Sequence, residues 1–257
     1  MDVRLIRNAT LRLRYGSRNF LIDPMLSVRH AIRPMGDATE RNPTVDLPCS
    51  INEVLADVDT VLVSHLHPDH FDEAAFGIVP RSLPIFCQPG DGDRLAAAGF
   101  QVTEMVGPTT LGDVQITPVA GQHGSGAVLD RMGSVVGFVL RSPGEPTLYW
   151  AGDTVLCEAV RDNIEHERPD VIITHSGGAT AGGITILMDI ADTLAVADLA
   201  PDAVVVAVHL EAVAHAPVSR AELRAAADAA GIGRDRLAIP DDGEQLSFGV
   251  KVGAGDR

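Results

Sequence analysis

Short apolar runs alternate with helix-like stretches along most of this chain. Residues 3–6 and 11–15 alternate apolar side chains with arginine, which is typical of strands that expose one face to water. The runs at 135–140 and 147–150 flank a Pro-Gly turn and are expected to pair with each other. Further strands are predicted at residues 20–22, 61–63, 84–87, 114–119, 171–173 and 204–208.

Helix signals fall between these strands. Ser50 and Ser219 each stand three residues before a glutamate, and this capping-box pattern opens a helix. The other expected helices cover residues 71–76, residues 93–98 before Gly99, and residues 187–199 before Pro201. The helix after Ser219 is expected to close at Gly231. Because no low-complexity run or composition break interrupts the alternation, we expect a single α/β domain over residues 1–257.

Residues 25–50 carry no regular apolar period. The segment holds several prolines together with Arg29, His30, Arg33 and Arg41. Loops of this length are usually lids, binding loops or disordered links. Two interpretations stay open, a lid that contributes cationic groups and a solvated surface loop.

Composition excludes some functions. The formal net charge is −15, which disfavours nucleic acid because binding requires neutralisation of phosphates. We expect neither a signal peptide nor a membrane span, because no apolar stretch is long enough. Cys49, Cys87 and Cys157 are widely separated, which fits reduced thiols and a cytoplasmic protein. The apolar fraction of 46% is compatible with self-association.

The densest group of chemically active side chains lies in residues 64–70, which read Ser-His-Leu-His-Pro-Asp-His. It follows the predicted strand at 61–63, and its proline favours a turn there. His65 and His67 alternate along extended backbone and can point one way, while Asp69 and His70 point toward a second position. The pattern suits two cations, and the alternative is a polar loop that happens to be rich in histidine.

Three other predicted strands end near a candidate metal ligand, namely His123, Asp153 and His209. In an α/β layer fold the loops at one sheet edge converge, so these residues can meet the first group. All the ligand atoms are nitrogen or oxygen. Such a set suits Zn²⁺ first, and Mn²⁺ or Fe²⁺ also fit.

The order of these residues resembles that of the metallo-β-lactamase fold superfamily. The closest branch by this resemblance contains ascorbate-6-phosphate lactonase and related metal-dependent hydrolases. Residues 21–24, the Gly-Gln-His-Gly around His123 and the Ala-Gly-Asp-Thr around Asp153 belong to the same likeness. The resemblance implies a four-layer αβ/βα sandwich with its site at one sheet edge. It also implies a first metal on His65, His67 and His123, a second on Asp69, His70 and His209, and Asp153 as the bridge.

The chain departs from related families in ways that bear on its chemistry. No cysteine occupies the position of the second-metal ligand of zinc β-lactamases, so antibiotic hydrolysis is not expected. Asn8 stands where many lactonase-like relatives carry histidine. Its side-chain amide can form hydrogen bonds but cannot titrate. His67 stands where the flavin-linked diiron members tend to have glutamate, which favours hydrolysis over redox chemistry.

These features predict a metal-dependent hydrolase. A hydroxide bound by two metals would attack a small anionic lactone, ester, amide or phosphoester. Asp69 and Asp153 are the expected catalytic residues, with Asp69 orienting the nucleophile. Asp23 is expected to support a ligand imidazole from behind.

Three weaker candidates follow the later strands. His175 is either a pocket residue or a loop histidine held by a hydrogen bond. His215 competes with His209 for the last metal position, and His209 is preferred because it directly follows an apolar strand. Glu211, between them, is a candidate for contact with substrate or with the second metal.

Two other functions compete with the leading one. One is a phosphodiesterase of the same fold, and the other is a non-catalytic metal-binding or ligand-binding protein. The sequence leaves the substrate open, because specificity resides in loops that a motif cannot place.

Overall fold

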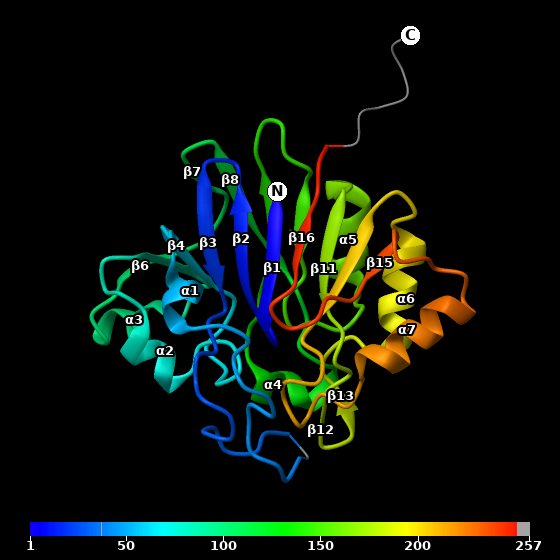
Figure 1. The fold of residues 1–257 in the computed structure, drawn as a ribbon, viewed down its shortest axis with the longest axis horizontal. Helices are drawn as coiled ribbons and strands as arrows, with labels where there is room; N and C mark the ends of the chain where they lie inside the picture. The colour runs from blue at the N-terminus through cyan, green and yellow to red at the C-terminus, as the bar shows by residue number, and fades with distance from the viewer. Residues whose placement is uncertain (37, 251–257) are drawn as a thin grey trace.

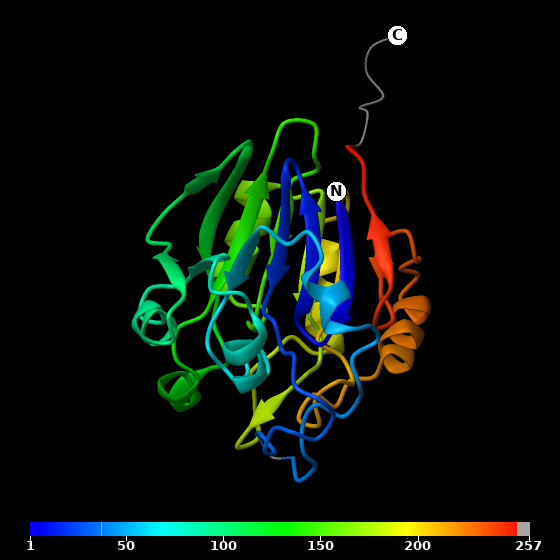
Figure 2. The ribbon, with the colours of Figure 1, turned by 60° about the vertical axis from the view of Figure 1, so that its left-hand side comes forward.

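Two seven-stranded sheets lie face to face in the computed structural model of the protein, with helices on both outer faces (Figure 1). The structure describes residues 1–36 and 38–250, so residue 37 and residues 251–257 of the predicted domain lie outside the described residues. Turning the molecule by 60° shows the sheets as adjacent layers (Figure 2). The arrangement is the predicted four-layer αβ/βα sandwich.

The first sheet has the order β16-β1-β2-β3-β4-β5-β6. Its N-terminal strands form an antiparallel meander, and β3 to β6 then run parallel. Its strands are β1 (Asp2–Arg7), β2 (Thr10–Tyr15), β3 (Arg18–Ile22), β4 (Thr60–Val63), β5 (Pro84–Cys87), β6 (Gln101–Glu104) and β16 (Gln245–Ser247).

The second sheet has the order β15-β14-β11-β10-β9-β8-β7. Here β7 to β10 pair antiparallel, whereas β10, β11, β14 and β15 are parallel. Its strands are β7 (Thr109–Leu111), β8 (Val114–Ala120), β9 (Val136–Arg141), β10 (Leu148–Trp150), β11 (Val171–His175), β14 (Val204–Val208) and β15 (Leu237–Ala238). A separate hairpin joins β12 (Thr180–Ala181) to β13 (Ile184–Thr185).

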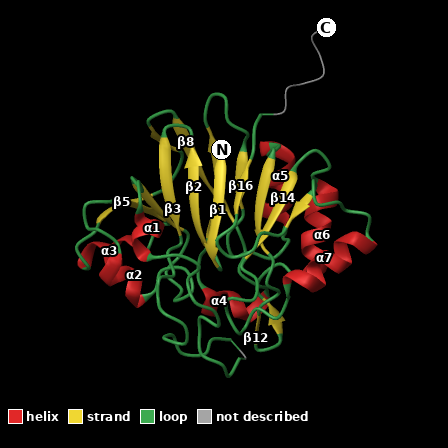
Figure 3. Cartoon of the chain, in the orientation of Figure 1, coloured by secondary structure: helices red, strands yellow, loops and turns green. Residues whose placement is uncertain are grey.

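The helices divide between the two outer faces (Figure 3). Helices α1 (Ile51–Leu55), α2 (Glu73–Ile78) and α3 (Gly92–Ala97) cover the first sheet, and α5 (Glu158–Glu167), α6 (Ile190–Leu199) and α7 (Arg220–Ala229) cover the second. A 3-10 turn (Gly126–Val128) and the short α4 (Leu129–Met132) lie beyond the strand ends. Both predicted capping boxes are present, at Ser50 and at Ser219. No helix among the described residues is long and apolar enough to cross a membrane.

The layers explain why the central strands are apolar throughout. Successive strand residues point to opposite faces of a sheet. In β4, Leu62 therefore enters the core between the two sheets, while Val61 and Val63 pack beneath the helices of the first sheet. In β11, Ile173 faces the first sheet and Ile172 faces the outer helices. Strands covered on both faces cannot show the polar alternation of an exposed strand.

Arg7, at the end of β1, holds the long loop of residues 25–50 against this sandwich. Its buried guanidinium donates to the carbonyls of Met25, Ser27 and Val45 over 2.8 to 3.0 Å. Burial lowers the pKa of Arg7 to about 10. Because the guanidinium replaces water as the partner of these carbonyls, it fixes the start and the end of the loop.

The stacked pair of Phe138 and Trp150 gives a test of the core between the sheets. The ring centroids lie 5.3 Å apart at an interplanar angle of 5°. Phe138→Ala should lower the free energy of unfolding by about 3–5 kcal/mol, since it removes both apolar burial and ring packing. Denaturant unfolding measures this change. Val106→Ala, at a side chain that is 88% exposed, should change it by less than about 0.5 kcal/mol. Equal losses in the two variants would contradict the packing described.

Candidate metal centre

The predicted ligands all lie where strands of the two sheets end. The group of residues 65–70 follows β4, and His123 follows β8. Asp153 follows β10, and His209 follows β14. The loops that leave these strands gather at the lower end of the sandwich in Figure 1, so residues distant in sequence meet there.

The turn after β4 orients the first ligands. The amides of His70 and Phe71 both donate to the carbonyl of His67, at 2.9 and 3.0 Å. Asp72 then caps α2 by accepting from the amide of Ala75 at 2.8 Å, and its other oxygen accepts from the amide of Ser27 at 2.7 Å. The cap and the loop contact thus hold the histidine turn from both sides.

The first group of ligand atoms comes from His65, His67, His123 and Asp153, which lie within 4.8 Å of one another. The Nδ1 of His123 is 2.8 Å from the carbonyl of Ile186. Because a carbonyl only accepts, this nitrogen carries the proton, and Nε2 is left with its lone pair for a metal.

The second group comes from His70, Asp153, His175 and His209. Nε2 of His70 is 3.1 Å from Oδ2 of Asp153, and Nε2 of His209 is 3.8 Å from Oδ1. His175 enters the group as an additional imidazole, with Nδ1 2.6 Å from Oδ1 of Asp153. The resemblance to known hydrolases did not assign it a ligand position.

Asp69 lies beside this second group. Its Oδ2 is 3.3 Å from Nε2 of His209 and 3.4 Å from Nε2 of His215. Burial raises the pKa of the Asp69 carboxyl, but attraction to the two neighbouring imidazoles outweighs burial and holds that pKa well below its usual range. His209 belongs to the second group, whereas His215 lies outside it and contacts Asp69 and the ring of His209.

The ionisable groups at the centre shift one another's pKa values strongly. Burial raises the pKa of the Asp153 carboxyl, yet His70 and His209 reverse this effect and lower it well below its usual range. For His70 burial lowers the pKa, and the carboxylates of Asp153 and Asp23 raise it well above the usual value. Burial lowers the pKa of His65 well below the usual value, with the neighbouring His70 adding to the effect. The pKa of each of these groups therefore depends on its neighbours in the cluster.

The donor set fits divalent cations. The Nε2 atoms of His65, His70 and His209 are buried and have no hydrogen-bond partner. Moving a polar nitrogen from water into an apolar environment without a hydrogen-bond partner costs several kcal/mol. Coordination of a metal is one way to give such a nitrogen a partner. Three unpartnered nitrogens around one buried carboxylate therefore match a metal centre better than a set of structural histidines.

Asp23 supports the centre from behind. Its Oδ2 is 2.6 Å from Nδ1 of His70, and its carboxylate also accepts from the amide and hydroxyl of Ser64 at 2.8 and 2.7 Å. A carboxylate behind a ligand imidazole fixes the ring and its tautomer. This contact is the one expected for Asp23 from the sequence.

Asn8 contacts the backbone of two candidate ligands. Its side-chain Nδ2 donates to the backbone carbonyl of Asp69 at 2.9 Å. Its backbone carbonyl accepts from the backbone amide of His209 at 3.0 Å. The residue is fully buried and adopts a φ of 60°. It thereby connects the backbone of two candidate ligands that come from different sheets.

A cavity of about 160 Å³ opens onto the candidate ligands. Most of its other lining is apolar and comes from Met35, Pro68, Met132, Ala181, Ile186 and Leu187. His215 and Arg131 also line it. At Gly36, a Cβ atom would lie 2.9 Å from the carbonyl of Thr180, so a glycine there lets the loop of residues 25–50 approach β12.

Two candidate groups near the site bind to other parts of the chain. The Glu211 carboxylate does not reach the ligands, because it accepts from the amide of Arg220 at 2.8 Å and from its guanidinium at 2.6 Å. The loop of residues 25–50 does line the cavity, but through Met35 and Gly36. Arg41 instead binds the carbonyls of His30 and Ala31 in its own loop.

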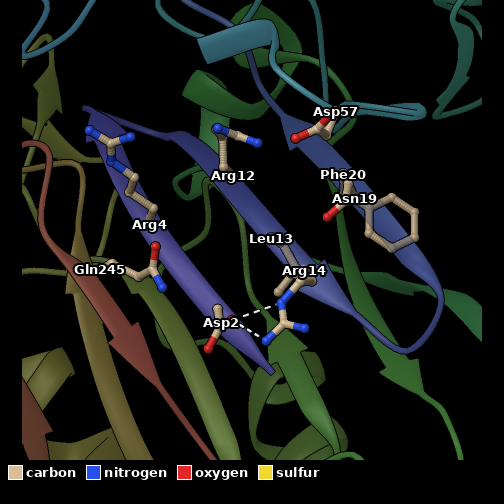
Figure 4. Close-up of a pocket in the computed structure, with 9 residues that line it drawn as sticks. All are labelled: Asp2, Arg4, Arg12, Leu13, Arg14, Asn19, Phe20, Asp57 and Gln245. Atoms are coloured by element: carbon tan, nitrogen blue, oxygen red, sulfur yellow. Dashed lines mark hydrogen bonds and ion pairs between the residues drawn. The ribbon is translucent and has the colours of Figure 1, made fainter. Parts of the chain in front are cut away.

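A larger hollow of about 450 Å³ lies on β1 and β2, and Figure 4 shows its three arginines. Arg14 is paired with Asp2, and the Nε of Arg4 donates to the carbonyl of Gly243. Arg12 donates to the carbonyls at the end of α1. Since these guanidinium groups already have partners within the protein, we assign the chemistry to the smaller cavity at the ligand cluster.

Comparisons with known proteins agree with this fold. Residues 18–210 match the family model described as "Beta-lactamase superfamily domain". UPF0173 protein YddR of Bacillus subtilis (strain 168) is 36% identical over 255 residues, which cover 96% of this chain and all of that protein. The chain therefore belongs to the metallo-β-lactamase superfamily, as the ligand motif implies.

Two solved structures are similar over nearly the whole chain. Isothiocyanate hydrolase from Delia radicum gut bacteria is 34% identical with a TM-score of 0.92, covering 97% of this chain and 100% of that one. A "possible metal-dependent hydrolase" from Veillonella parvula DSM 2008 is 31% identical with a TM-score of 0.93, covering 96% of this chain and 99% of that one.

The contact between Asp23 and His70 gives a test of the centre. Asp23→Asn removes the negative charge behind the His70 ring with little change of volume. The affinity for Zn²⁺ should fall by about 10–100-fold, as measured by competition with a chromophoric chelator. Asp113→Asn, whose carboxylate binds Ser17 at an exposed site, is the control and should bind as the wild type does. The assignment fails if both variants bind Zn²⁺ equally well.

Proposed function

We propose that this protein is a metal-dependent hydrolase with a centre for two divalent cations, Zn²⁺ being the first choice and Mn²⁺ or Fe²⁺ the alternatives. The observation that carries the proposal is the convergence of buried, unpartnered imidazole nitrogens around Asp153, next to a cavity. One cation would be held by His65, His67 and His123, the other by Asp69, His70 and His209, with Asp153 shared.

Two cations in this position would activate a water molecule for attack and polarise the bond that is attacked. Asp69 lines the cavity and is held in its charged form by His209 and His215. A charged carboxylate accepts a hydrogen bond, so Asp69 is suited to orient the attacking water. The apolar residues around the cavity limit the entry of other water molecules.

The lining of the cavity bears on the substrate. Arg131 is the only lysine or arginine among the described residues that line it. Anionic phosphodiesters are usually bound by several cationic groups or by backbone amides. The apolar walls instead favour a compact carbon electrophile with little charge, which departs from the anionic substrate expected from the sequence.

Two kinds of carbon electrophile fit. A lactone or ester offers a carbonyl carbon, and an isothiocyanate offers the carbon between nitrogen and sulfur. Water added to an isothiocyanate yields an amine and carbonyl sulfide. The full-length similarity to the isothiocyanate hydrolase makes organic isothiocyanates the first substrates to test.

Metal content tests the centre itself. By plasma mass spectrometry the wild type should hold about two equivalents of metal, the number expected of a two-metal site. His65→Ala and His209→Ala should each bring the content toward one. His166→Ala is the matched control, because that imidazole is exposed and contacts a helix carbonyl. A wild type that binds no metal after reconstitution would rule the hydrolase out.

Turnover tests the reaction class. The reconstituted protein should hydrolyse an arylalkyl isothiocyanate or an aromatic lactone, and a chelator should abolish the activity. Hydrolysis of bis-p-nitrophenyl phosphate alone would assign a phosphodiesterase instead. Tight metal binding without turnover of any of the three compounds would favour the non-catalytic alternative.

Met132 tests the part of the cavity that would hold the substrate. Met132→Ala removes apolar contact at the wall, so kcat/KM for a small substrate should fall by about 10-fold or more, as for loss of a few methylene-sized contacts. A bulkier analogue should lose less. The metal content should stay unchanged. Leu199→Ala, at an exposed position on α6, should leave both rates unchanged. If Met132→Ala changes kcat/KM for none of the substrates that the protein hydrolyses, the cavity is not the substrate site.

A further inference from the structure

The proposed ligand set leaves one imidazole at the centre without a role. His175 ends β11, is fully buried, and lies in contact with Asp153. It is the sixth histidine of the cluster, beside the five proposed as ligands.

The two oxygens of Asp153 have different surroundings. Oδ2 lies 3.1, 3.4 and 3.8 Å from the Nε2 atoms of His70, His123 and His65. These imidazoles belong to both proposed metal positions, so Oδ2 is placed to be shared between them. Oδ1 accepts from Nδ1 of His175 at 2.6 Å and lies 3.8 Å from Nε2 of His209.

This hydrogen bond fixes the rotation of the carboxylate. The terminal torsion of an aspartate is broad, so the rotamer alone does not fix the plane of the carboxylate. A donor on one oxygen fixes that plane, because turning it away would leave Nδ1 of His175 buried without an acceptor. A ring nitrogen that donates its hydrogen in this way has no lone pair left for a metal.

The ring of His175 is itself held in place by its neighbours. Trp150 meets it edge to face, with ring centroids 5.3 Å apart, and His70 stacks on it at 5.7 Å. His209 lies 5.3 Å away. Trp150 also stacks on Phe138 in the core between the sheets, so the position of the donor is tied to the packing of the sandwich.

We propose that His175 is a positioning residue, which holds Asp153 with Oδ2 between the two metal positions and is not itself a ligand. The inference rests on the proposed function, since it assumes that Asp153 is shared by two cations. The geometry that carries it is the contact of 2.6 Å on one oxygen and the three imidazoles around the other.

The experiment separates positioning from ligation by comparing two substitutions. An asparagine amide can place its N–H near the position of Nδ1 but offers no ring nitrogen to a metal. His175→Leu fills the space and removes the donor. Purified protein freed of metal is titrated with Zn²⁺ against a chromophoric chelator, and the Co²⁺-loaded protein is examined by visible absorption.

Positioning predicts different results for the two variants. His175→Leu should bind the weaker of the two cations about 10–100-fold less tightly, as for loss of an outer-shell hydrogen bond, and should show an altered Co²⁺ spectrum. His175→Asn should stay close to the wild type in both measurements. Thr174→Val, which removes a neighbouring hydroxyl of β11 that binds Ser176, is the control and should retain both metals.

Three outcomes would overturn the inference. Equal losses in the Asn and Leu variants would make His175 a ligand, and wild-type affinity in the Leu variant would leave it without a role. An equal loss of metal affinity in Thr174→Val would show that the effect comes from a disturbed β11 strand. A wild type that binds no metal would defeat the proposed function itself, whereas two metals in the wild type with an unaffected Leu variant would defeat only this inference.

Discussion

The buried carboxylate of Asp153 is the contact on which the centre depends. One of its oxygens faces imidazoles of both ligand groups, and the other binds His175. A carboxylate in such surroundings is stable only while its cationic or hydrogen-bonding partners stay in place, because burial without them is strongly unfavourable. The ends of several strands must therefore keep their relative positions, and the chemistry constrains the packing of the whole sandwich.

The two sheets share the site between them. The first sheet supplies the histidines of the turn after β4, and the second supplies His123, Asp153 and His209. The spacing of these two sets is determined by the side chains packed between the sheets, among them Phe138 and Trp150. Trp150 also contacts His175, so one side chain belongs to the core and borders the centre. Stability and metal geometry are thus coupled through direct contacts.

The cavity is built differently from the ligand cluster. Its apolar walls come from the loop of residues 25–50, from α4 and from the β12–β13 hairpin, none of which belongs to the two large sheets. Loops on a rigid scaffold are where specificity usually resides. We therefore expect substrate specificity to reside in these loop residues and not in the two sheets.

The sequence by itself determined the features that depend on neighbouring residues. Strand periodicity, the capping boxes at Ser50 and Ser219, and the histidine turn are all local patterns, and the structure contains each of them. The order of ligand motifs also indicated the superfamily. Local patterns survive because they are set by backbone geometry within a few residues.

Only the tertiary structure decided contacts between distant segments. Glu211 looked available for the site, yet Arg220 binds it on the far side of its loop. The sequence left His175 open between a pocket residue and a loop histidine until β11 was placed beside β10, and nothing distinguished Met35 until its loop crossed the cavity. Side-chain partners across such separations depend on the packing of whole layers, and no periodicity or local spacing records which side chains those layers bring together.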